Sequence, residues 1–342
     1  MPNSKIVLTC GGTGGHVYPA IALAQELTEY QSVFLGSTDR IDGDMVRHHG
    51  FPFYGVAGSY SPIWSVIFGT VRAWSHLRRI RPKVVICTGG MITFPVAIAA
   101  KLRGIPIVVL EQNMIAGRTN KVLSRLAKLV ISAFPGTIGL RHAVPLGNPV
   151  RKKFLHDRWI DQLVPILQEQ TAVILVFGGS QGARAINRTV LNCIPEFAAH
   201  RWFLVHIMGE SDYRAMGYTG AIQSIVTPSE KVVGVLVPYA ESMDLLYKYA
   251  SVVVCRAGAT SIAELFEFNS RAVLIPYPFA KDDHQTANAA VVDRSGRAVV
   301  LKESQLKPAT LVAAIESARR LIPPDPTPGA RERVATMIRK LI

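Results

Sequence analysis

The turn Gly11-Gly12-Thr13-Gly14-Gly15 is the first segment whose residue types could do chemistry, and His16 follows it directly. Glycine lets the backbone approach an anion closely, and a helix starting here would present unpaired N–H groups to a phosphate. The spacing differs from the GxGxxG dinucleotide fingerprint, and no acidic residue ends the next predicted strand. We therefore predict an anion-binding turn, with a tight structural turn as the alternative.

His16 is the residue of this turn that can accept a proton. An imidazole near the positive end of a helix is held neutral at about pH 7, so it can act as a general base. We predict that His16 is catalytic. Orienting a bound substrate is the alternative role.

Two further glycine turns lie in the second half of the chain. Gly178-Gly179-Ser180-Gln181-Gly182 repeats the first pattern, and the Ser180 hydroxyl could bond a phosphate oxygen. Arg256-Ala257-Gly258-Ala259-Thr260-Ser261 follows another apolar run, and Glu264 comes one helical turn later. A carboxylate there can bind both hydroxyls of a ribose, although an ordinary acid complementing the helix dipole is the simpler interpretation of Glu264 alone.

The polar segment 281–288 leaves a further predicted strand through Pro276 and Pro278. Taken alone, it is typical of a solvated loop that leads into a helix. Ligands of open α/β sheets bind at the carboxyl ends of the strands. Together, the three glycine turns and this loop therefore predict a crevice for a sugar nucleotide.

Metal and disulfide sites have little support in the sequence. Asp42-Gly43-Asp44 is a DxD string of the kind that holds a metal in some glycosyltransferases, but a helix cap explains it better. The four cysteines are scattered with no CxxC pair, which fits a reduced, cytosolic setting. HExxH, GxSxG and Walker patterns do not occur, so those protease, hydrolase and NTPase classes have no support.

Short apolar runs alternate with amphipathic segments, which predicts an α/β fold with parallel sheets covered on both faces. The predicted strands are 6–10, 33–35, 84–87, 107–110, 129–132, 173–177, 203–207, 232–237, 252–255 and 272–275. The predicted helices span 17–29, 63–80, 96–102 and 120–126 and centre near 188, 245, 263, 290 and 314.

The two halves are alike, because each opens with an apolar strand that runs into a glycine turn and a helix. We therefore predict two Rossmann-like domains. The predicted divisions are domains at 1–150 and 151–322, a hinge near 147–151, a proline-rich linker at 323–329, and a closing helix at 330–342 that packs back on the first domain.

The composition is that of a well-packed, basic protein. Of the 342 residues, 49% are hydrophobic and 18% charged, which excludes a disordered chain. The 38 basic and 24 acidic residues give a net charge of +14. Residues 1–150 hold 15 basic and 6 acidic residues, or +9. The expected partners are acidic: nucleic acid, phosphorylated substrates or an anionic membrane surface.

Residues 62–74 combine large apolar side chains, among them Trp64 and Phe68, with a basic cluster that follows from Arg72 to Lys83. This suits a helix lying in the surface of an anionic bilayer, and core packing is the equal alternative. No apolar stretch is long enough to span a bilayer, and the amino-terminal residues do not form a signal peptide.

Together these motifs resemble the MurG family of bacterial N-acetylglucosaminyltransferases, which act on lipid I. The shared segments are GGTGGH with Val17–Ala20, Glu111–Asn113, Gly147–Arg151, GGSQGA, Cys255–Ala259 and DHQTANA. The resemblance implies the GT-B fold, two Rossmann-like domains facing across a cleft. It also implies a peripheral enzyme on the cytoplasmic side of the cell membrane, whose first domain binds acceptor and membrane and whose second binds UDP-GlcNAc.

By position, the resemblance assigns Arg151 and Ser180 to the diphosphate of the donor and Glu264 to its ribose. The full set of implied nucleotide-sugar contacts is Thr13, Gly14, Gly15, Asn113, Arg151, Ser180, Ala259, Thr260, Ser261, Ile262, Ala263, Glu264 and Gln285.

The implied reaction is an inverting hexosyl transfer from UDP-GlcNAc to the 4-hydroxyl of the muramoyl sugar of lipid I, giving lipid II, with His16 as base. We expect no protein-bound metal; a divalent cation such as Mg²⁺ would accompany UDP in solution. Implied partners are UDP-GlcNAc, lipid I, an anionic membrane surface and the cell-wall and division machinery. A UDP-GlcNAc 2-epimerase-like enzyme stays open as an alternative. A nucleic-acid-binding protein is disfavoured, because the chain lacks an aromatic-rich basic platform.

Overall fold

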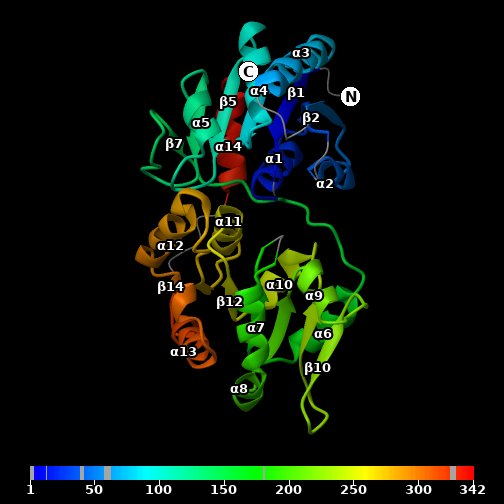
Figure 1. The fold of residues 1–342 in the computed structure, drawn as a ribbon, viewed down its shortest axis with the longest axis vertical. Helices are drawn as coiled ribbons and strands as arrows, with labels where there is room; N and C mark the ends of the chain where they lie inside the picture. Colours follow the sequence, from blue (N-terminus) through cyan, green and yellow to red (C-terminus); the bar gives the residue numbers. More distant parts are fainter. Residues whose placement is uncertain (1–3, 13, 39–41, 58–62, 180–181, 324–328) are drawn as a thin grey trace. The chain divides into compact units, whose positions relative to one another are not determined.

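The computed structural model describes residues 4–12, 14–38, 42–57, 63–179, 182–323 and 329–342. The chain forms two compact units (Figure 1). The first comprises Met1–Lys153 together with Gly329–Ile342, and the second comprises Phe154–Pro328.

The first unit contains a seven-stranded, all-parallel sheet with the order β3-β2-β1-β4-β5-β6-β7. Its strands are β1 (Lys5–Cys10), β2 (Gln31–Ser37), β3 (Phe53–Ala57), β4 (Val85–Gly89), β5 (Ile107–Glu111), β6 (Leu129–Ser132) and β7 (Val144–Pro145). Its helices are α1 (Gly14–Glu26), α2 (Asp42–His48), α3 (Ile63–Ile80), α4 (Thr93–Leu102), α5 (Arg118–Leu123) and α14 (Ala330–Arg339). The chain crosses from one side of β1 to the other between β3 and β4, which makes β1/β4 the switch point of a Rossmann-like sheet.

The second unit repeats this plan with the order β10-β11-β9-β8-β12-β13-β14, parallel except for the β10/β11 hairpin. Its strands are β8 (Val173–Phe177), β9 (Phe203–Ile207), β10 (Gln223–Val226), β11 (Val232–Val237), β12 (Val252–Cys255), β13 (Ala272–Leu274) and β14 (Ala298–Val300). Its longer helices are α6 (Ile160–Gln168), α7 (Arg184–Asn192), α11 (Ala259–Glu267), α12 (His284–Arg294) and α13 (Pro308–Arg319), with shorter α8 (Ile194–Ala199), α9 (Glu210–Ala215) and α10 (Met243–Tyr249).

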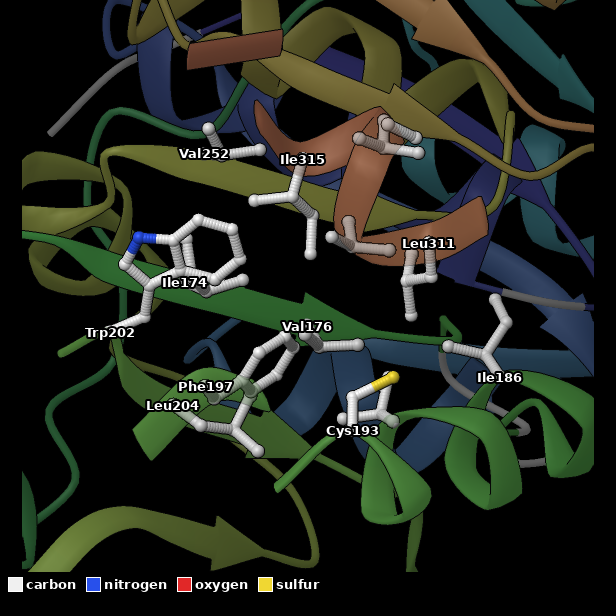
Figure 2. Close-up of a cluster of buried hydrophobic side chains, with 14 of the residues drawn as sticks. Ile174, Val176, Ile186, Cys193, Phe197, Trp202, Leu204, Val252, Leu311 and Ile315 are labelled. Atoms are coloured by element: carbon white, nitrogen blue, oxygen red, sulfur yellow. The ribbon is translucent and has the colours of Figure 1, made fainter. Parts of the chain in front are cut away.

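The central strands are mainly apolar and buried because helices cover both faces of each sheet. In β1, Ile6 and Leu8 belong to one buried cluster and Val7 to another. In the second unit, Ile174 and Val176 of β8 pack between side chains of neighbouring helices, such as Ile186 of α7 and Leu311 and Ile315 of α13 (Figure 2). This pattern confirms the predicted α/β class with two parallel-dominated sheets.

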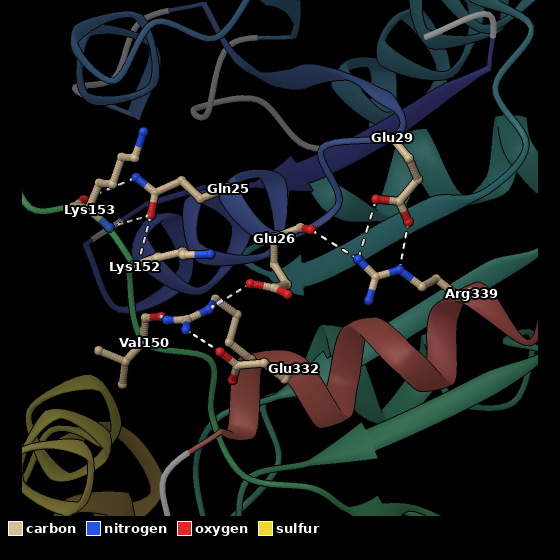
Figure 3. A network of polar contacts seen from close by, with 9 residues as sticks. Gln25, Glu26, Glu29, Val150, Lys152, Lys153, Glu332 and Arg339 are labelled. Atoms are coloured by element: carbon tan, nitrogen blue, oxygen red, sulfur yellow. Dashed lines mark hydrogen bonds and ion pairs between the residues drawn. The ribbon is translucent and has the colours of Figure 1, made fainter.

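The last helix, α14, completes the first unit rather than the second. Its apolar face, with Val334 and Ile338, joins the cluster around β1 and α1. Two ion pairs connect it to α1 and the turn beyond it: Arg331 Nε lies 3.1 Å from Glu26 Oε2, and Arg339 Nε lies 2.6 Å from Glu29 Oε1 (Figure 3).

All ten predicted strands are present, but four strands were not predicted: β3, β7, β10 and β14. They are the end strands of the two sheets, and each gives a weak signal: β3 is interrupted by Gly55, β10 begins with two polar residues, and β7 and β14 have only two and three residues. The predicted linker falls largely on residues 324–328, which lie outside the described residues.

Candidate active site

The site in the first unit is built where three neighbouring parallel strands end. The glycine turn at Gly11–Gly15 follows β1, the pair Gly89–Gly90 ends β4, and Gln112 follows β5. Because β1, β4 and β5 are adjacent, their carboxyl ends bring these segments to one edge of the sheet. The edge is also the switch point, where α/β sheets bind their ligands.

Two glycines allow the close approach of β4 to the first turn of α1. Gly89 has φ +116°, and a Cβ there would lie 2.7 Å from the His16 ring. Gly90 has φ +91°, and its Cβ would lie 2.5 Å from the carbonyl oxygen of Gly11. Both positions need glycine for conformation and for space. Neither glycine was among the predicted site residues, although the position of the pair at the end of a predicted strand could have indicated a tight turn.

His16 is the third residue of α1, and its half-buried ring has a fixed setting. Its Nδ1 lies 3.2 Å from Oε1 of Gln112. The Thr88 hydroxyl donates to the carbonyl oxygen of His16 at 2.8 Å. The predicted base is therefore held at both backbone and ring by the ends of β4 and β5.

Glu111 organises the loop that carries Asn113. This carboxylate is buried and accepts four hydrogen bonds, from the backbone and side-chain nitrogens of Asn113 (2.9 and 3.3 Å), from the Gly117 N–H (3.0 Å) and from Asn120 Nδ2 (2.9 Å). Four donors compensate the buried charge. Glu111 thus has a structural role that fixes the predicted contact residue Asn113 at the same edge as His16.

Arg151 lies in the first unit and is buried, with its guanidinium 3.8 Å from the ring centroid of Tyr18 on α1. His49 lies close by, 6.2 Å from Tyr18 between ring centroids. Burial, together with the charges of Arg151 and His48, lowers the pKa of His49 to about 4. A neutral imidazole and an aromatic face therefore surround the guanidinium.

The site in the second unit also lies at the switch point of its sheet, where β8 and β12 are adjacent. Gly178 follows β8, and a Cβ there would lie 2.4 Å from the backbone nitrogen of Ala183, so this turn is also tightly closed. Ser180, like Thr13 in the first unit, lies outside the described residues.

The third glycine turn leads into α11, which begins at Ala259. Glu264 is the sixth residue of this helix, so it lies in the second turn. It is only 6% exposed, and the hydroxyl of Tyr247 donates to its Oε2 at 3.0 Å. The Tyr247 ring is itself stacked on Phe268 at 5.0 Å between centroids. Glu264 is thus more deeply buried and more firmly held than a simple dipole-complementing acid.

The remaining predicted contacts of the second unit differ in exposure. Thr260, Ser261 and Gln285 are half-buried, whereas the side chains of Ile262 and Ala263 face the core. Only their backbone could therefore touch a ligand. Asn288, which the sequence analysis did not single out, ties α12 to the third glycine turn by donating from Nδ2 to the carbonyl oxygen of Ala257 at 3.1 Å.

Helix α3 has an exposed apolar surface. Phe68 and Val71 are 65% and 63% exposed, whereas Ala73 and Leu77 on the other side of the helix are buried. The side chain of Trp64 is outside the described residues. Core packing therefore explains only part of the apolar pattern. No helix in the described part of the chain is both long and apolar enough to cross a membrane.

A basic cavity lies where α3 ends and β1 begins. Its volume is about 690 Å³, and five basic residues line it: Lys5, Arg78, Arg79, Arg81 and Lys83. Among the described residues none of these five forms an ion pair with an acidic side chain. This part of the first unit therefore presents a concentrated, uncompensated positive charge.

Comparison with known proteins identifies the family of both units. Residues 6–132 match the glycosyltransferase family 28 N-terminal domain, and residues 173–329 match the family 28 C-terminal domain. The UDP-N-acetylglucosamine–N-acetylmuramyl-(pentapeptide) pyrophosphoryl-undecaprenol N-acetylglucosamine transferase of Halothermothrix orenii is 34% identical over 91% of this chain and 89% of its own length. The enzyme of the same name from Syntrophotalea carbinolica is 36% identical, over 91% and 88%.

Solved structures give the same answer for the fold. The crystal structure of Acinetobacter baumannii MurG is 28% identical, with a TM-score of 0.73 over 98% of this chain and 99% of that one. A putative UDP-N-acetylglucosamine 2-epimerase from Listeria monocytogenes has a TM-score of 0.63 at 11% identity, which shows a shared fold alone. The predicted GT-B fold is confirmed, and the chain is a glycosyltransferase that belongs to the MurG family.

Proposed function

We propose that this chain transfers N-acetylglucosamine from UDP-GlcNAc to the 4-hydroxyl of the muramoyl sugar of lipid I, with inversion at the anomeric carbon, giving lipid II. The names of the relatives support this donor and acceptor. The structural observation that supports it best is the position of His16. Its imidazole contacts Gln112 and packs against Gly89, and it lies on the first turn of the helix that follows the predicted anion-binding turn. A single displacement needs such a group to remove the proton of the attacking hydroxyl.

In this proposal the acceptor oxygen bonds to the anomeric carbon as the bond from that carbon to UDP breaks, and His16 takes the hydroxyl proton. The leaving diphosphate gains negative charge, which Arg151, Ser180 and the N–H groups at the start of α11 would stabilise. Glu264 would bind the ribose, with Tyr247 fixing one of its oxygens. The scheme needs no metal held by the protein, and a cation such as Mg²⁺ would arrive with the nucleotide.

The other proposed contacts to the donor divide between the units. Gly14, Gly15 and Asn113 would contribute from the first unit, and Gln285 from the second. Between Ala259 and Ala263, the half-buried Thr260 and Ser261 support side-chain contacts, and the buried Ile262 and Ala263 support backbone contacts.

Incubation with labelled UDP-GlcNAc, with and without lipid I, tests the reaction. Lipid-I-dependent transfer of the label to a lipid-extractable product, with release of UDP, is expected. Conversion of the sugar at its second carbon without lipid I would instead identify an epimerase, the alternative that the shared fold leaves in place. Absence of label transfer under saturating lipid I would overturn the proposal.

The same proposal includes attachment to an anionic membrane surface on the cytoplasmic side. Lipid I is anchored in the bilayer, since each buried CH₂ contributes about 0.8 kcal/mol, so the enzyme must come to the surface. The exposed side chains of Phe68 and Val71 and the basic cavity beside the end of α3 support a role of the first unit. The proposed product, lipid II, would place the enzyme in cell-wall synthesis and, through cell-wall synthesis, in the control of cell shape and division.

Vesicle co-sedimentation tests the membrane contact. The double variant Phe68→Ser, Val71→Ser should bind anionic vesicles at least tenfold more weakly than the original chain, since each lost apolar contact is worth about 1.5 kcal/mol or more. Val122→Ser, which removes a 44% exposed apolar side chain of α5, is the matched control. Equal vesicle binding by all three proteins would rule this surface out.

A further inference from the structure

The side-chain amide of Gln112 has a fixed orientation. Its Nε2 donates to the carbonyl oxygen of Thr88 at 2.8 Å and to that of Leu110 at 3.2 Å. Gln112 is 1% exposed, so water cannot replace these partners. If the amide were turned over, its oxygen would face two carbonyl oxygens, and both hydrogen bonds from Nε2 would be lost. The strand ends of β4 and β5 therefore determine which end of the amide faces away from them.

The end that faces His16 is the oxygen. Oε1 of Gln112 lies 3.2 Å from Nδ1 of the imidazole. An amide oxygen carries no hydrogen, so the hydrogen of this bond must be on Nδ1. A neutral imidazole has a single N–H, and its other nitrogen then carries the lone pair. Within the described part of the chain, Nε2 of His16 makes no hydrogen bond that would compete for this lone pair.

We propose that Gln112 is a positioning residue that selects the Nδ1–H tautomer of His16 and so leaves Nε2 as the basic atom for the acceptor hydroxyl. This inference rests on the proposed function, in which His16 is the base. Two further contacts fix the ring in place. The Thr88 hydroxyl holds the His16 backbone, and the missing side chain of Gly89 leaves room for the ring.

The partner of the imidazole is neutral, although a carboxylate is adjacent in the sequence. Successive residues of an extended chain point to opposite sides, and Glu111 is turned into the loop, where both of its oxygens accept hydrogen bonds from Asn113, Gly117 and Asn120. A carboxylate next to Nδ1 would stabilise the imidazolium by its charge, whereas a neutral amide orients the ring and stabilises the imidazolium less. The arrangement thus orients the imidazole without placing a carboxylate against it.

The chain contains a second buried imidazole–amide pair, which serves as a matched control. His206 Nε2 lies 2.9 Å from Asn187 Oδ1 in the second unit, and burial lowers the pKa of His206 to about 3. The pair is fully enclosed and has no part in the proposed reaction. Replacing Asn187 therefore disturbs an equivalent buried contact without touching the candidate base.

The first test reads the tautomer directly by ¹⁵N NMR of histidine-labelled protein, with the His16 signals assigned through His16→Gln. The full-length chain should show a protonated Nδ1 and an unprotonated Nε2. In Gln112→Leu the selection should be lost, giving a mixture or the Nε2–H form, while Asn187→Leu should leave the His16 signals unchanged. An Nε2–H tautomer in the original chain, or no change in Gln112→Leu, would overturn the inference.

The second test uses the pH dependence of lipid II formation. Gln112→Leu should lower kcat roughly 10- to 10²-fold with KM for UDP-GlcNAc nearly unchanged, since only base orientation is lost. Gln112→Glu should restore part of kcat and move the acid limb of kcat/KM upward by about one pH unit or more. Asn187→Leu should leave that limb in place. A Gln112→Glu profile that coincides with the original would also contradict the inference.

Failure of the proposed function would look different. If His16→Ala kept most of its turnover, or if no lipid-dependent transfer occurred, the assignment of the base or of the reaction would fall. The NMR result would still report whether Gln112 selects the tautomer.

Discussion

In the first unit, the groups that hold His16 at the ends of β4 and β5 are neutral: the amide of Gln112 contacts the ring, the hydroxyl of Thr88 contacts the backbone, and backbone carbonyls in turn hold the amide. In the second unit, the helix that follows β12 carries a carboxylate, Glu264, which is buried and anchored by a tyrosine. The two sheets have related strand orders, with a switch point beside the first strand of each unit. The same scaffold thus holds an imidazole in one unit and a buried carboxylate in the other.

The comparison indicates that the turns, rather than the sheets, determine the chemistry. Both edges use glycine to bring a helix start close to a strand end. What differs is the side chain that the helix carries, which is His16 on α1 and Glu264 on α11. Three predictions test this division of roles, and a fourth concerns an ion pair outside both edges; they are given in order of decreasing effect.

Removal of the imidazole should have the largest effect. His16→Ala should lower kcat roughly 10²–10⁴-fold, the usual contribution of a general base, while UDP affinity stays nearly unchanged. Steady-state kinetics with lipid I and calorimetric titration with UDP measure the two quantities. Loss of UDP affinity in parallel with turnover would mean that His16 binds the donor instead, and the two edges would then share one role.

Crowding the imidazole should have the next largest effect. Gly89→Ala places a Cβ 2.7 Å from the His16 ring at φ +116°, so turnover should fall on the order of 10²-fold and unfolding free energy by about 1–3 kcal/mol. Gly50→Ala is the control, because Gly50 also has a positive φ (+80°) but has open space around it. It should cost about 1 kcal/mol in stability and leave turnover intact. Equal losses of turnover in both variants would indicate backbone strain rather than displacement of the ring.

Removal of the carboxylate of Glu264 should weaken UDP binding rather than lower turnover. Glu264→Ala should weaken UDP binding by about 1–3 kcal/mol, as expected for loss of a charge-assisted hydrogen bond. Glu267→Ala, on the same helix, is the matched control, and Tyr247→Phe should give a smaller loss because the carboxylate remains. If calorimetry showed that Glu264→Ala binds UDP with unchanged affinity, Glu264 would not bind the ribose.

The smallest effect concerns neither edge and shows how little a solvent-exposed ion pair contributes. The hydrogen bond from Arg339 lowers the pKa of Glu29, so the folded chain binds this proton less tightly than the unfolded chain. The pair therefore stabilises the fold above pH about 4.3, and the stabilisation is lost as the pH falls through the lowered value. Since both side chains are more than one-third exposed, Arg339→Ala should cost less than about 0.5 kcal/mol at pH 7.

Urea unfolding at pH 7 and pH 3 measures this difference, with Lys340→Ala as the control. The deficit of Arg339→Ala should shrink at the lower pH. A deficit that grew on acidification would show that the helix is held by another interaction.

The sequence predicted the central strands and the three glycine turns because each leaves a local signal: a continuous apolar run or a cluster of glycines. It predicted the outer strands poorly, since β3 or β14 needs few buried residues. It also missed the roles of Gln112 and Glu111. Glu111 ends β5 and Gln112 follows it, and their side chains diverge to the Asn113 loop and to the imidazole; only the pairing of β5 with β4 reveals which partner each one meets.

The way in which α14 closes the first unit has a consequence for biosynthesis. The second unit is inserted in the chain between Lys153 and Gly329, so its residues are contiguous, whereas the first unit needs both ends of the polypeptide. On a ribosome the strands of the first sheet emerge before the second unit, but the side chains of Val334, Ala335 and Ile338 that complete its core follow the second unit in the chain. The core of the first unit can therefore be completed only after the whole second unit has been synthesised, and loss of α14 would expose its apolar interior.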